Sequence, residues 1–250
     1  MTFHVIIPAR YDSKRLPGKV LLPLKGKTIL QWVYERAIKS GADSVTIATD
    51  DERILNVVQE FGGKSVLTLS THESGSDRIA EAARVLQLMN NEIIVNVQAD
   101  EPFIPVSAIL QVAENCKNSN SPVATLCKPI ENWEKIQDIN AVKVVFNKHK
   151  EALYFSRSEI PYLRTDGSSA IKDQKYLHLY HHHVGIYAYR AHFLQEYVSW
   201  GPCDIELAER LEQLRVLWHG YKIHVDLAHE VPPGDINTIE DFEAAVKGKY

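Results

Sequence analysis

The sequence predicts an α/β fold in which a mostly parallel sheet has helices on both faces. Short continuous apolar runs, such as residues 5–7 and 93–97, are typical of strands that are buried on both sides. Helical patterns with their own start and stop signals separate these runs through the first half of the chain. Strands joined by helical crossovers favour parallel pairing, and 250 residues are enough to bury a large core.

The first half of the chain alternates regularly between the two patterns. Ile29, Val33 and Ala37 lie on one face of a predicted helix over residues 27–39, which Gly41 closes. The elements predicted after it are a strand at 45–48, a helix at 52–61, a strand at 65–68, a helix at 79–89 and a strand at 93–97.

The second half has a different pattern. It predicts a hairpin over residues 142–155, a polar loop over 165–175, one long helix from Asp204 to Trp218, a strand at 222–227 and a last helix capped at Asn237-Thr238. We therefore expect one α/β domain over 1–250. Its nucleotide-binding lobe takes about 1–130 and 204–250, and a smaller lobe is inserted at about 131–203.

Composition narrows the class of protein. Apolar and charged contents of 45% and 24% are ordinary for a globular protein, and a net charge of −4 argues against general nucleic-acid binding. No run is long enough to predict membrane insertion, and Arg10 interrupts the apolar start that a signal peptide needs. Three cysteines without ligand spacing predict reduced thiols and a cytoplasmic protein.

A basic loop follows the first strand. It contains Arg10, Ser13, Lys14, Arg15 and Lys19, and a Pro-Gly turn places the last of these at a bend. Ligands of open α/β sheets bind at the carboxyl ends of the strands, and guanidinium and ammonium groups suit a polyphosphate. The Walker A pattern is absent. The alternative interpretation is a solvated basic loop.

A carboxylate follows the most apolar strand. Asp100 comes after residues 93–97, level with the basic loop if the two strands are parallel. A carboxylate beside phosphates typically carries Mg²⁺, although an Asp just past a strand can also be a turn residue. The chain lacks Asp-x-Asp here, which favours nucleotide activation over glycosyl transfer. His181 and His183 share a strand face, but no further ligand completes a zinc set.

The chain resembles the bacterial 3-deoxy-manno-octulosonate cytidylyltransferases (CMP-Kdo synthetases) over nearly its whole length. The resemblance rests on eight segments in the family's order: IPARYDSKRLPGK, ATDDERI, THESGSDRIAEA, VNVQADEPFIP, NAVKVV, ALYFSRSEIPY, HVGIYAYR and LEQLRVLWHG. It implies a Rossmann-like nucleotide-diphospho-sugar transferase fold and a homodimer paired through the inserted lobe. It also implies Mg²⁺-dependent conversion of CTP and the acid sugar Kdo to CMP-Kdo and pyrophosphate for lipopolysaccharide assembly.

The resemblance also implies roles for individual residues. The residues expected at the CTP phosphates are Arg10, Ser13, Arg15 and Lys19, and those expected at cytosine and ribose are Ser74, Gly75 and Arg78. Gln98 and Asp100 are expected where sugar and metal meet, and Arg157 and Arg164 at the sugar's carboxylate. The expected sugar-hydroxyl contacts are His183, Tyr187, Glu212 and Gln213, the last two also interpretable as polar residues of a surface helix. Arg10, Lys19 and Asp100 would carry the catalysis.

Two departures from the family pattern affect the site. Ala99 stands where the family usually has Gly, and Asn237 stands where the family has its second acidic metal ligand. Our hypothesis is that Asp235 supplies the missing carboxylate, because alternate side chains of an extended segment point the same way. Asn237 would then give a neutral oxygen to the metal, or would only cap the last helix.

Other functions remain open at this point. A CMP-sialate synthetase would also join CTP to an acid sugar, although the sugar-side segments fit Kdo better. An 8-amino analogue of Kdo cannot be separated from Kdo by the sequence. A non-catalytic nucleotide-sugar binding module is the alternative from a different class, and the presence of Arg10, Lys19 and Asp100 argues against it.

Overall fold

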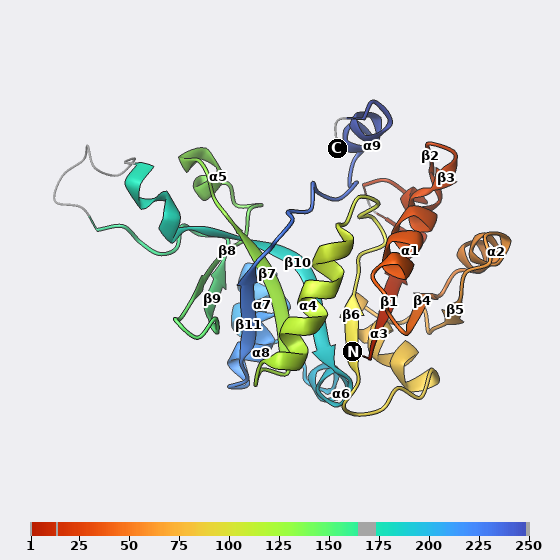
Figure 1. Ribbon diagram of the computed structural model, residues 1–250, viewed down its shortest axis with the longest axis horizontal. Helices are drawn as coiled ribbons and strands as arrows, with labels where there is room; N and C mark the ends of the chain where they lie inside the picture. The colour runs from red at the N-terminus through yellow and green to blue at the C-terminus, as the bar shows by residue number, and fades with distance from the viewer. Residues whose placement is uncertain (1, 14, 165–173, 249–250) are drawn as a thin grey trace.

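A computed structural model of the chain describes residues 2–13, 15–164 and 174–248 and confirms the predicted α/β fold (Figure 1). The strands are β1 (Phe3–Ala9), β2 (Pro23–Leu24), β3 (Lys27–Thr28), β4 (Ser44–Thr49), β5 (Ser65–Leu67), β6 (Ile93–Asn96), β7 (Val123–Pro129), β8 (Lys143–Phe146), β9 (Ala152–Ser156), β10 (His181–Arg190) and β11 (Ile223–Leu227). The helices are α1 (Ile29–Lys39), α2 (Glu52–Glu60), α3 (Gly75–Val85), α4 (Val106–Asn118), α5 (Trp133–Gln137), α6 (Ala191–Ser199), α7 (Asp204–Glu209), α8 (Leu214–Trp218) and α9 (Ile239–Val246), with 3₁₀ turns η1 (Lys19–Leu21) and η2 (Gln174–Leu179).

The main sheet is mixed. Its strand order is β11-β7-β10-β6-β1-β4-β5, and β8 and β9 extend it from β10. Strand β1 is parallel to both β4 and β6, whereas β10 runs antiparallel to β6 and β7. The chain fills one side of β1 with β4 and β5 before it returns to the other side with β6. Ligands of open α/β sheets bind at such a switch point, here at the carboxyl ends of β1 and β6.

Helices cover both faces of the sheet because its central strands are apolar on both faces. Val5 and Ile7 of β1 belong to the core that packs against α1 and α4. Ile6 points the opposite way and joins the core with α3 and α6. Figure 1 shows α1 and α4 on the near face of the sheet. The apolar side chains of the strands are thus used in packing, and the residues at the strand ends are left for chemistry.

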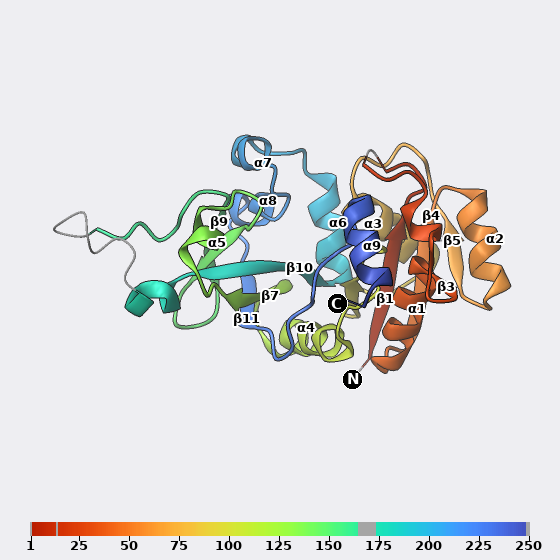
Figure 2. The same cartoon turned by 90° about the horizontal axis from the view of Figure 1, so that it is seen from above.

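The predicted inserted lobe shares the sheet with the rest of the chain. The predicted hairpin is β8 and β9, which pair antiparallel, and β8 pairs with the first residues of β10. The later residues of β10 pair with β6 in the nucleotide lobe. Figure 2 shows β9 and α5 on one side of the molecule, with β10 leading to them. The boundary at 131–203 stays a prediction.

The long helix predicted from Asp204 to Trp218 is wrong. Helix α7 ends at Glu209 because Arg210 adopts a left-handed conformation (φ 52°, ψ 51°), and α8 starts only at Leu214. The predicted apolar face is therefore split, and Leu207 and Trp218 are exposed. The break matters for function, because the segment between the two helices faces a cavity described below.

Smaller differences concern element ends. Helix α3 starts at Gly75 rather than at residue 79 because Ser74 and Asp77 form a capping box, and it ends at Val85. Helix α1 starts at Ile29, after the short strand β3. Of the predicted loop at 165–175, residues 165–173 lie outside the described residues, and the last two belong to η2. Among the described residues, no helix combines the length and apolar character needed to cross a bilayer.

Candidate functional site

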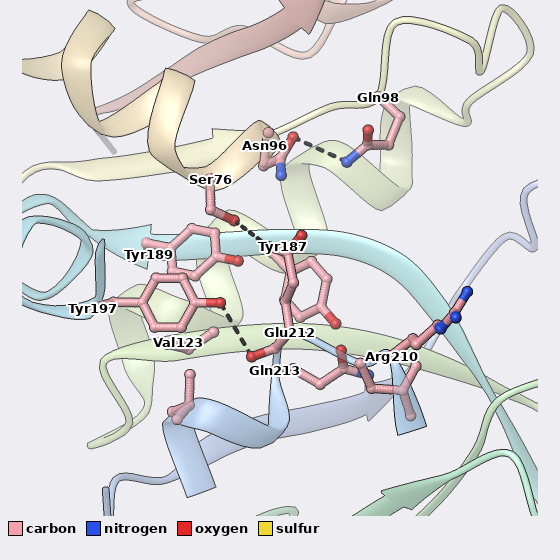
Figure 3. A pocket seen from close by; sticks show the side chains of 13 residues that line it. Ser76, Asn96, Gln98, Val123, Tyr187, Tyr189, Tyr197, Arg210, Glu212 and Gln213 are labelled. Atoms are coloured by element: carbon pink, nitrogen blue, oxygen red, sulfur yellow. Dashed lines mark hydrogen bonds between the residues drawn. The ribbon is translucent and has the colours of Figure 1, made fainter. Parts of the chain in front are cut away.

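Two adjoining cavities open at the carboxyl ends of β1 and β6. The first, the loop cavity, has a volume of about 260 Å³ and is lined by Pro8, Arg10, Asp12, Ser13, Lys19, Val20, Gly75, Gln98, Ala99 and Asp100. The second, the tyrosine cavity, has a volume of about 290 Å³ and is lined by Gly75, Ser76, Asn96, Gln98, Val123, Tyr187, Tyr189, Tyr197, Arg210, Leu211, Glu212, Gln213 and Val216 (Figure 3). Gly75 and Gln98 line both, so the two cavities adjoin at these residues.

The basic loop after β1 is held in place by a glycine turn. Gly18 has φ +67°, and its N–H donates to the carbonyl of Tyr11 at 2.9 Å. A Cβ at this position would lie 3.1 Å from the Tyr11 ring, so the turn needs glycine for its conformation and its space. Lys19 follows as the first residue of η1, in a regular 3₁₀ turn rather than at the predicted open bend. Lys14 of this loop lies outside the described residues.

Arg10 joins the basic loop to the segment before α3. Its guanidinium donates to the carbonyl oxygens of His72 and Ser74, the second at 3.2 Å. Ser74 caps α3, and its hydroxyl accepts from the N–H of Asp77 at 3.1 Å. The N-terminus of α3 therefore lies beside the Arg10 guanidinium, where Gly75 lines both cavities. Backbone N–H groups and cations together favour phosphate oxygens at this position.

Lys19 connects the basic loop to β6 and to the C-terminal segment. Its ammonium forms an ion pair with Asp100 and donates to Asn237 Oδ1 at 3.0 Å. Arg15 donates to the same oxygen at 2.6 Å, and the N–H of Ile236 donates to the carbonyl of Asp100 at 2.9 Å. The basic loop, Asp100 and the C-terminal segment thus meet in one place. The meeting of the loop with Asp100 was predicted.

The oxygen atoms near Asp100 fit a hard divalent cation. Asp235 accepts from the Asn237 amide, so its carboxylate lies beside that side chain. Desolvation and the neighbouring charges of Asp100 and Asp235 raise the pKa of Glu101 to about 8. Mg²⁺ needs only one or two protein carboxylates because it keeps waters. Within the described part of the chain, no group of three or more His, Cys, Asp or Glu side chains is arranged as a metal site.

The tyrosine cavity has an aromatic wall and a polar floor. Tyr187 and Tyr189 come from β10, and the rings of Tyr189 and Tyr197 stack with centroids 6.4 Å apart. Figure 3 shows these rings on one side of the cavity, with Asn96 and Gln98 reaching in from β6 and its following loop. Burial raises the pKa of Tyr187 well above its usual value, so the hydroxyl stays protonated and available as a donor.

Glu212 brings a carboxylate to this cavity from the segment between α7 and α8. Ser76 donates to Glu212 Oε2 at 3.2 Å, and Tyr197 donates to the Glu212 carbonyl at 3.1 Å. Desolvation raises the pKa of this carboxyl. Gln213 is buried at the same segment. A carboxylate, an amide and phenol hydroxyls form a lining that suits several hydroxyls of a sugar.

His183 lies behind the cavity rather than in its lining. Its Nε2 is 2.9 Å from the Thr125 hydroxyl, which itself donates to the carbonyl of Ile186 at 2.7 Å. His183 therefore donates from Nε2. Burial lowers its pKa to about 3, so it is neutral at physiological pH. The ring packs against Tyr187 with centroids 5.3 Å apart, which makes it a support for that side chain. Its predicted hydroxyl contact stays a prediction.

Three predicted arginine contacts have positions that do not match a simple ligand role. Arg78 is fully buried, and its guanidinium binds Asp50 at 2.9 Å and Thr68 at 2.6 Å. It lines neither cavity, which argues against the predicted cytidine contact. Arg157 donates to backbone carbonyls beside α7, and Arg164 is exposed outside both cavities.

Sequence reasoning missed several residues of the tyrosine cavity. They are Ser76, Asn96, Tyr189, Tyr197 and Arg210. Tyr189 could have been found from Tyr187, because residues two apart on a strand share a face. Arg210 carries no such signal, since its position depends on the unpredicted break between α7 and α8.

Comparisons with known proteins identify relatives of the whole chain. A cytidylyltransferase family model matches residues 4–223. The 3-deoxy-manno-octulosonate cytidylyltransferase of Photobacterium profundum is 51% identical over 246 residues, covering 97% of this chain and 97% of its own. The protein of the same name from Vibrio vulnificus (strain YJ016) is 51% identical over 247 residues, covering 99% and 98%.

Solved structures agree with these relatives. A CMP:2-keto-3-deoxy-manno-octonic acid synthetase complexed with CTP superposes with a TM-score of 0.88 at 40% identity, covering 98% of this chain and 97% of its own. A nucleotidyl transferase from Methanothermobacter thermautotrophicus has a TM-score of 0.63 at 14% identity over 98% and 96% of the two chains, which shows the fold alone. With half of its residues identical to these relatives over nearly its full length, the chain belongs to the 3-deoxy-manno-octulosonate cytidylyltransferase family.

Proposed function

We propose that the protein transfers the cytidylyl group of CTP to Kdo and releases pyrophosphate. The observation that carries the proposal is the pair of adjoining cavities, a cationic loop cavity and a hydroxyl-rich tyrosine cavity that share Gly75 and Gln98. The names of the relatives and the CTP in the similar synthetase support the same substrates. CTP would bind with its phosphates in the loop cavity, and Kdo would fill the tyrosine cavity.

The reaction follows from this placement. The 2-hydroxyl of Kdo attacks the α-phosphorus of CTP, a new oxygen–phosphorus bond forms and the bond to the β-phosphate breaks. The hydroxyl proton leaves to solvent. Both substrates are anionic, so holding them together supplies much of the rate increase. Arg10 and Lys19 would bind the departing pyrophosphate and stabilise its growing charge, and Ser74 and Gly75 would hold the nucleoside side at the start of α3.

The proposal includes Mg²⁺, held by Asp100 with oxygens of Asp235 and Asn237. These are oxygen ligands of the kind that Mg²⁺ takes; Asp100 and Asn237 contact the Lys19 ammonium, and Asp235 accepts from the Asn237 amide. The ion would supply Lewis acidity at the α-phosphate. The side chains around it would orient CTP through Lys19 and Arg15, both of which donate to Asn237 in the structure.

We further propose a cytoplasmic homodimer. Four large apolar side chains of the inserted lobe are exposed, which supports pairing through this lobe: Ile139, Leu153, Tyr162 and Leu179. Free, buried Cys116, Cys127 and Cys203 suit a reducing compartment. Light scattering of the wild type and Leu153→Glu tests the dimer. A wild-type monomer would refute it, and an unchanged dimer in the variant would move the interface away from β9.

Pyrophosphate release tests the proposed activity. The assay combines CTP and Mg²⁺ with Kdo, its 8-amino analogue or sialic acid, and a parallel series replaces CTP with UTP. We expect release with CTP and Kdo, and none in excess EDTA. Faster release with the 8-amino sugar or sialic acid would reassign the acid sugar. No release with any acid sugar would support the non-catalytic binding module.

A further inference from the structure

Two ionisable side chains line the tyrosine cavity. They are the carboxyl group of Glu212 and the guanidinium of Arg210. An acid sugar adds a second carboxylate, which is costly to leave unpaired beside a carboxyl that the cavity already desolvates. If the proposed function holds, a cation must face the sugar's carboxylate, and the lining of the cavity shows which one is available.

Arg157 is occupied elsewhere. Its Nε donates to the carbonyl of Glu209 at 2.7 Å, one terminal nitrogen donates to Ile139 at 3.0 Å, and the other donates to Arg210 at 3.4 Å. Its own backbone N–H binds the Glu209 carboxylate at 2.9 Å. These contacts hold the residues at the end of α7, and Arg157 does not line the cavity.

Arg210 is an exposed residue at the edge of the cavity and has an unusual backbone conformation. It has a left-handed conformation without being glycine, which is strained and persists only where neighbours fix it. Its N–H donates to the carbonyl of Glu206, and its carbonyl accepts from Arg157. Within the described residues, its guanidinium forms no hydrogen bond or ion pair. Figure 3 shows the Arg210 side chain at the edge of the cavity, extending away from the tyrosine rings, with no dashed line to it.

We propose that Arg210 binds the carboxylate of the acid sugar and that Arg157 is a positioning residue that fixes the 209–210 turn. The planar guanidinium suits a carboxylate, because it can donate two parallel hydrogen bonds. This assignment differs from the expectation that Arg157 and Arg164 themselves bind the carboxylate. It rests on the proposed function and names the group that selects acid sugars over neutral ones.

The test measures how strongly the enzyme distinguishes Kdo from its uncharged carboxamide. We expect Arg210→Gln to raise the KM for Kdo at least tenfold and to leave the KM for CTP unchanged. With the carboxamide as substrate, the KM of the variant should differ little from that of the wild type. Arg210→Lys should recover part of the loss, because it keeps the charge without the fork. Arg84→Gln, an exposed change on α3, is the control and should match the wild type.

The positioning role predicts that Arg157→Gln and Arg210→Gln are not additive. The double variant should have the same KM for Kdo as Arg210→Gln alone, because the turn matters only through Arg210. Multiplied losses would place Arg157 on the substrate and overturn its positioning role. Thermal unfolding of each variant separates misfolding from altered binding.

Three results would overturn the assignment of Arg210. They are an unchanged Kdo dependence in Arg210→Gln, equal losses with Kdo and the carboxamide, and a tenfold loss in Arg164→Gln with none in Arg210→Gln. In each of these, wild-type turnover persists, so only this inference fails. A wild type that turns over no acid sugar would refute the proposed function as well.

Discussion

Replacing Arg78 by Ala should unfold the protein at a lower temperature and leave its affinity for CTP unchanged. The Arg78 side chain is completely buried and forms an ion pair with Asp50 at 2.9 Å. Its second contact is the Thr68 hydroxyl at 2.6 Å. Through these bonds the residue connects α3 to the ends of β4 and β5. Its loss should therefore lower the free energy of unfolding rather than the affinity for CTP.

The structure sets the size of the effect. Removing one partner of a buried pair costs about 3–5 kcal/mol, because the other charge stays buried without compensation. The Asp50 side chain keeps 20% exposure, so water screens part of the charge and we expect about 3 kcal/mol. At about 2–4 °C per kcal/mol for a domain of this size, the melting temperature should fall by about 6–12 °C.

Differential scanning calorimetry and CTP titration at low temperature check this expectation. Arg84→Ala is the matched control, since it makes the same change on the exposed side of the same helix. It should shift the melting temperature by no more than a degree or two. A tenfold weaker CTP affinity in Arg78→Ala, with little change in melting temperature, would refute the argument and restore the predicted cytidine contact.

Three further outcomes are expected. Asp100→Asn should lower pyrophosphate release by about a hundredfold or more, measured at saturating substrates, because it removes charge where the transferred group is held. Glu101→Gln, melted without metal, should stabilise the protein by at least about 1 kcal/mol at pH 9 and not at pH 4. The raised pKa of about 8 means that the wild type loses stability as pH rises from 4.5 through 8. Cys116 and Cys127 should resist iodoacetamide at pH 8 until the chain unfolds, because burial raises the pKa of each thiol to about 12.

The sequence predicted the fold well where signals are local. The apolar runs of β1, β4 and β6 and the cap at Thr238 depend only on neighbouring residues, and these elements occur as expected. The basic loop was also recognisable, because its cations lie within ten positions and follow a buried strand. Parallel pairing then brings that loop to Asp100 without further information.

Prediction from the sequence failed where contacts with residues distant in the chain determine the structure. The resemblance alone suggested a nucleotide contact for Arg78, and its burial beside Asp50, 28 residues earlier in the chain, has no local signal in the sequence. The sequence favoured one helix from Asp204 to Trp218, yet Arg210 breaks it with a conformation that non-glycine residues rarely adopt. Only tertiary contacts such as that from Arg157 stabilise the break. The sequence therefore could not predict the edge of the cavity or the position of Arg210 in its lining.

The C-terminal segment offers the sharpest test of the proposed metal site. Asn237 Oδ1 accepts from Lys19 and Arg15, while its amide donates to Asp235, so Asn237 links Asp235 to the Lys19–Asp100 ion pair. The Asp235 carboxylate can therefore supply the charge that Asn237 lacks. The alternative is that Asp235 only orients the Asn237 amide and that Thr238, whose hydroxyl accepts from the N–H of Asp241, completes a plain helix cap.

Removing and restoring one charge separates the two interpretations of this segment. Asp235→Asn should raise the Mg²⁺ concentration for half-maximal activity several-fold, and Asn237→Asp should lower it and rescue the first change, because Mg²⁺ binds carboxylate more strongly than amide oxygen. Electron paramagnetic resonance can measure Mn²⁺ binding in the presence of CTP, without turnover. The Mn²⁺ affinities of the variants should rank in the same order as their Mg²⁺ requirements. Asp204→Asn, an exposed change at the start of α7, controls for lost surface charge. If Asp235→Asn leaves both curves in place, Asp235 is no ligand, and Asp100 holds the ion with Asn237 and water.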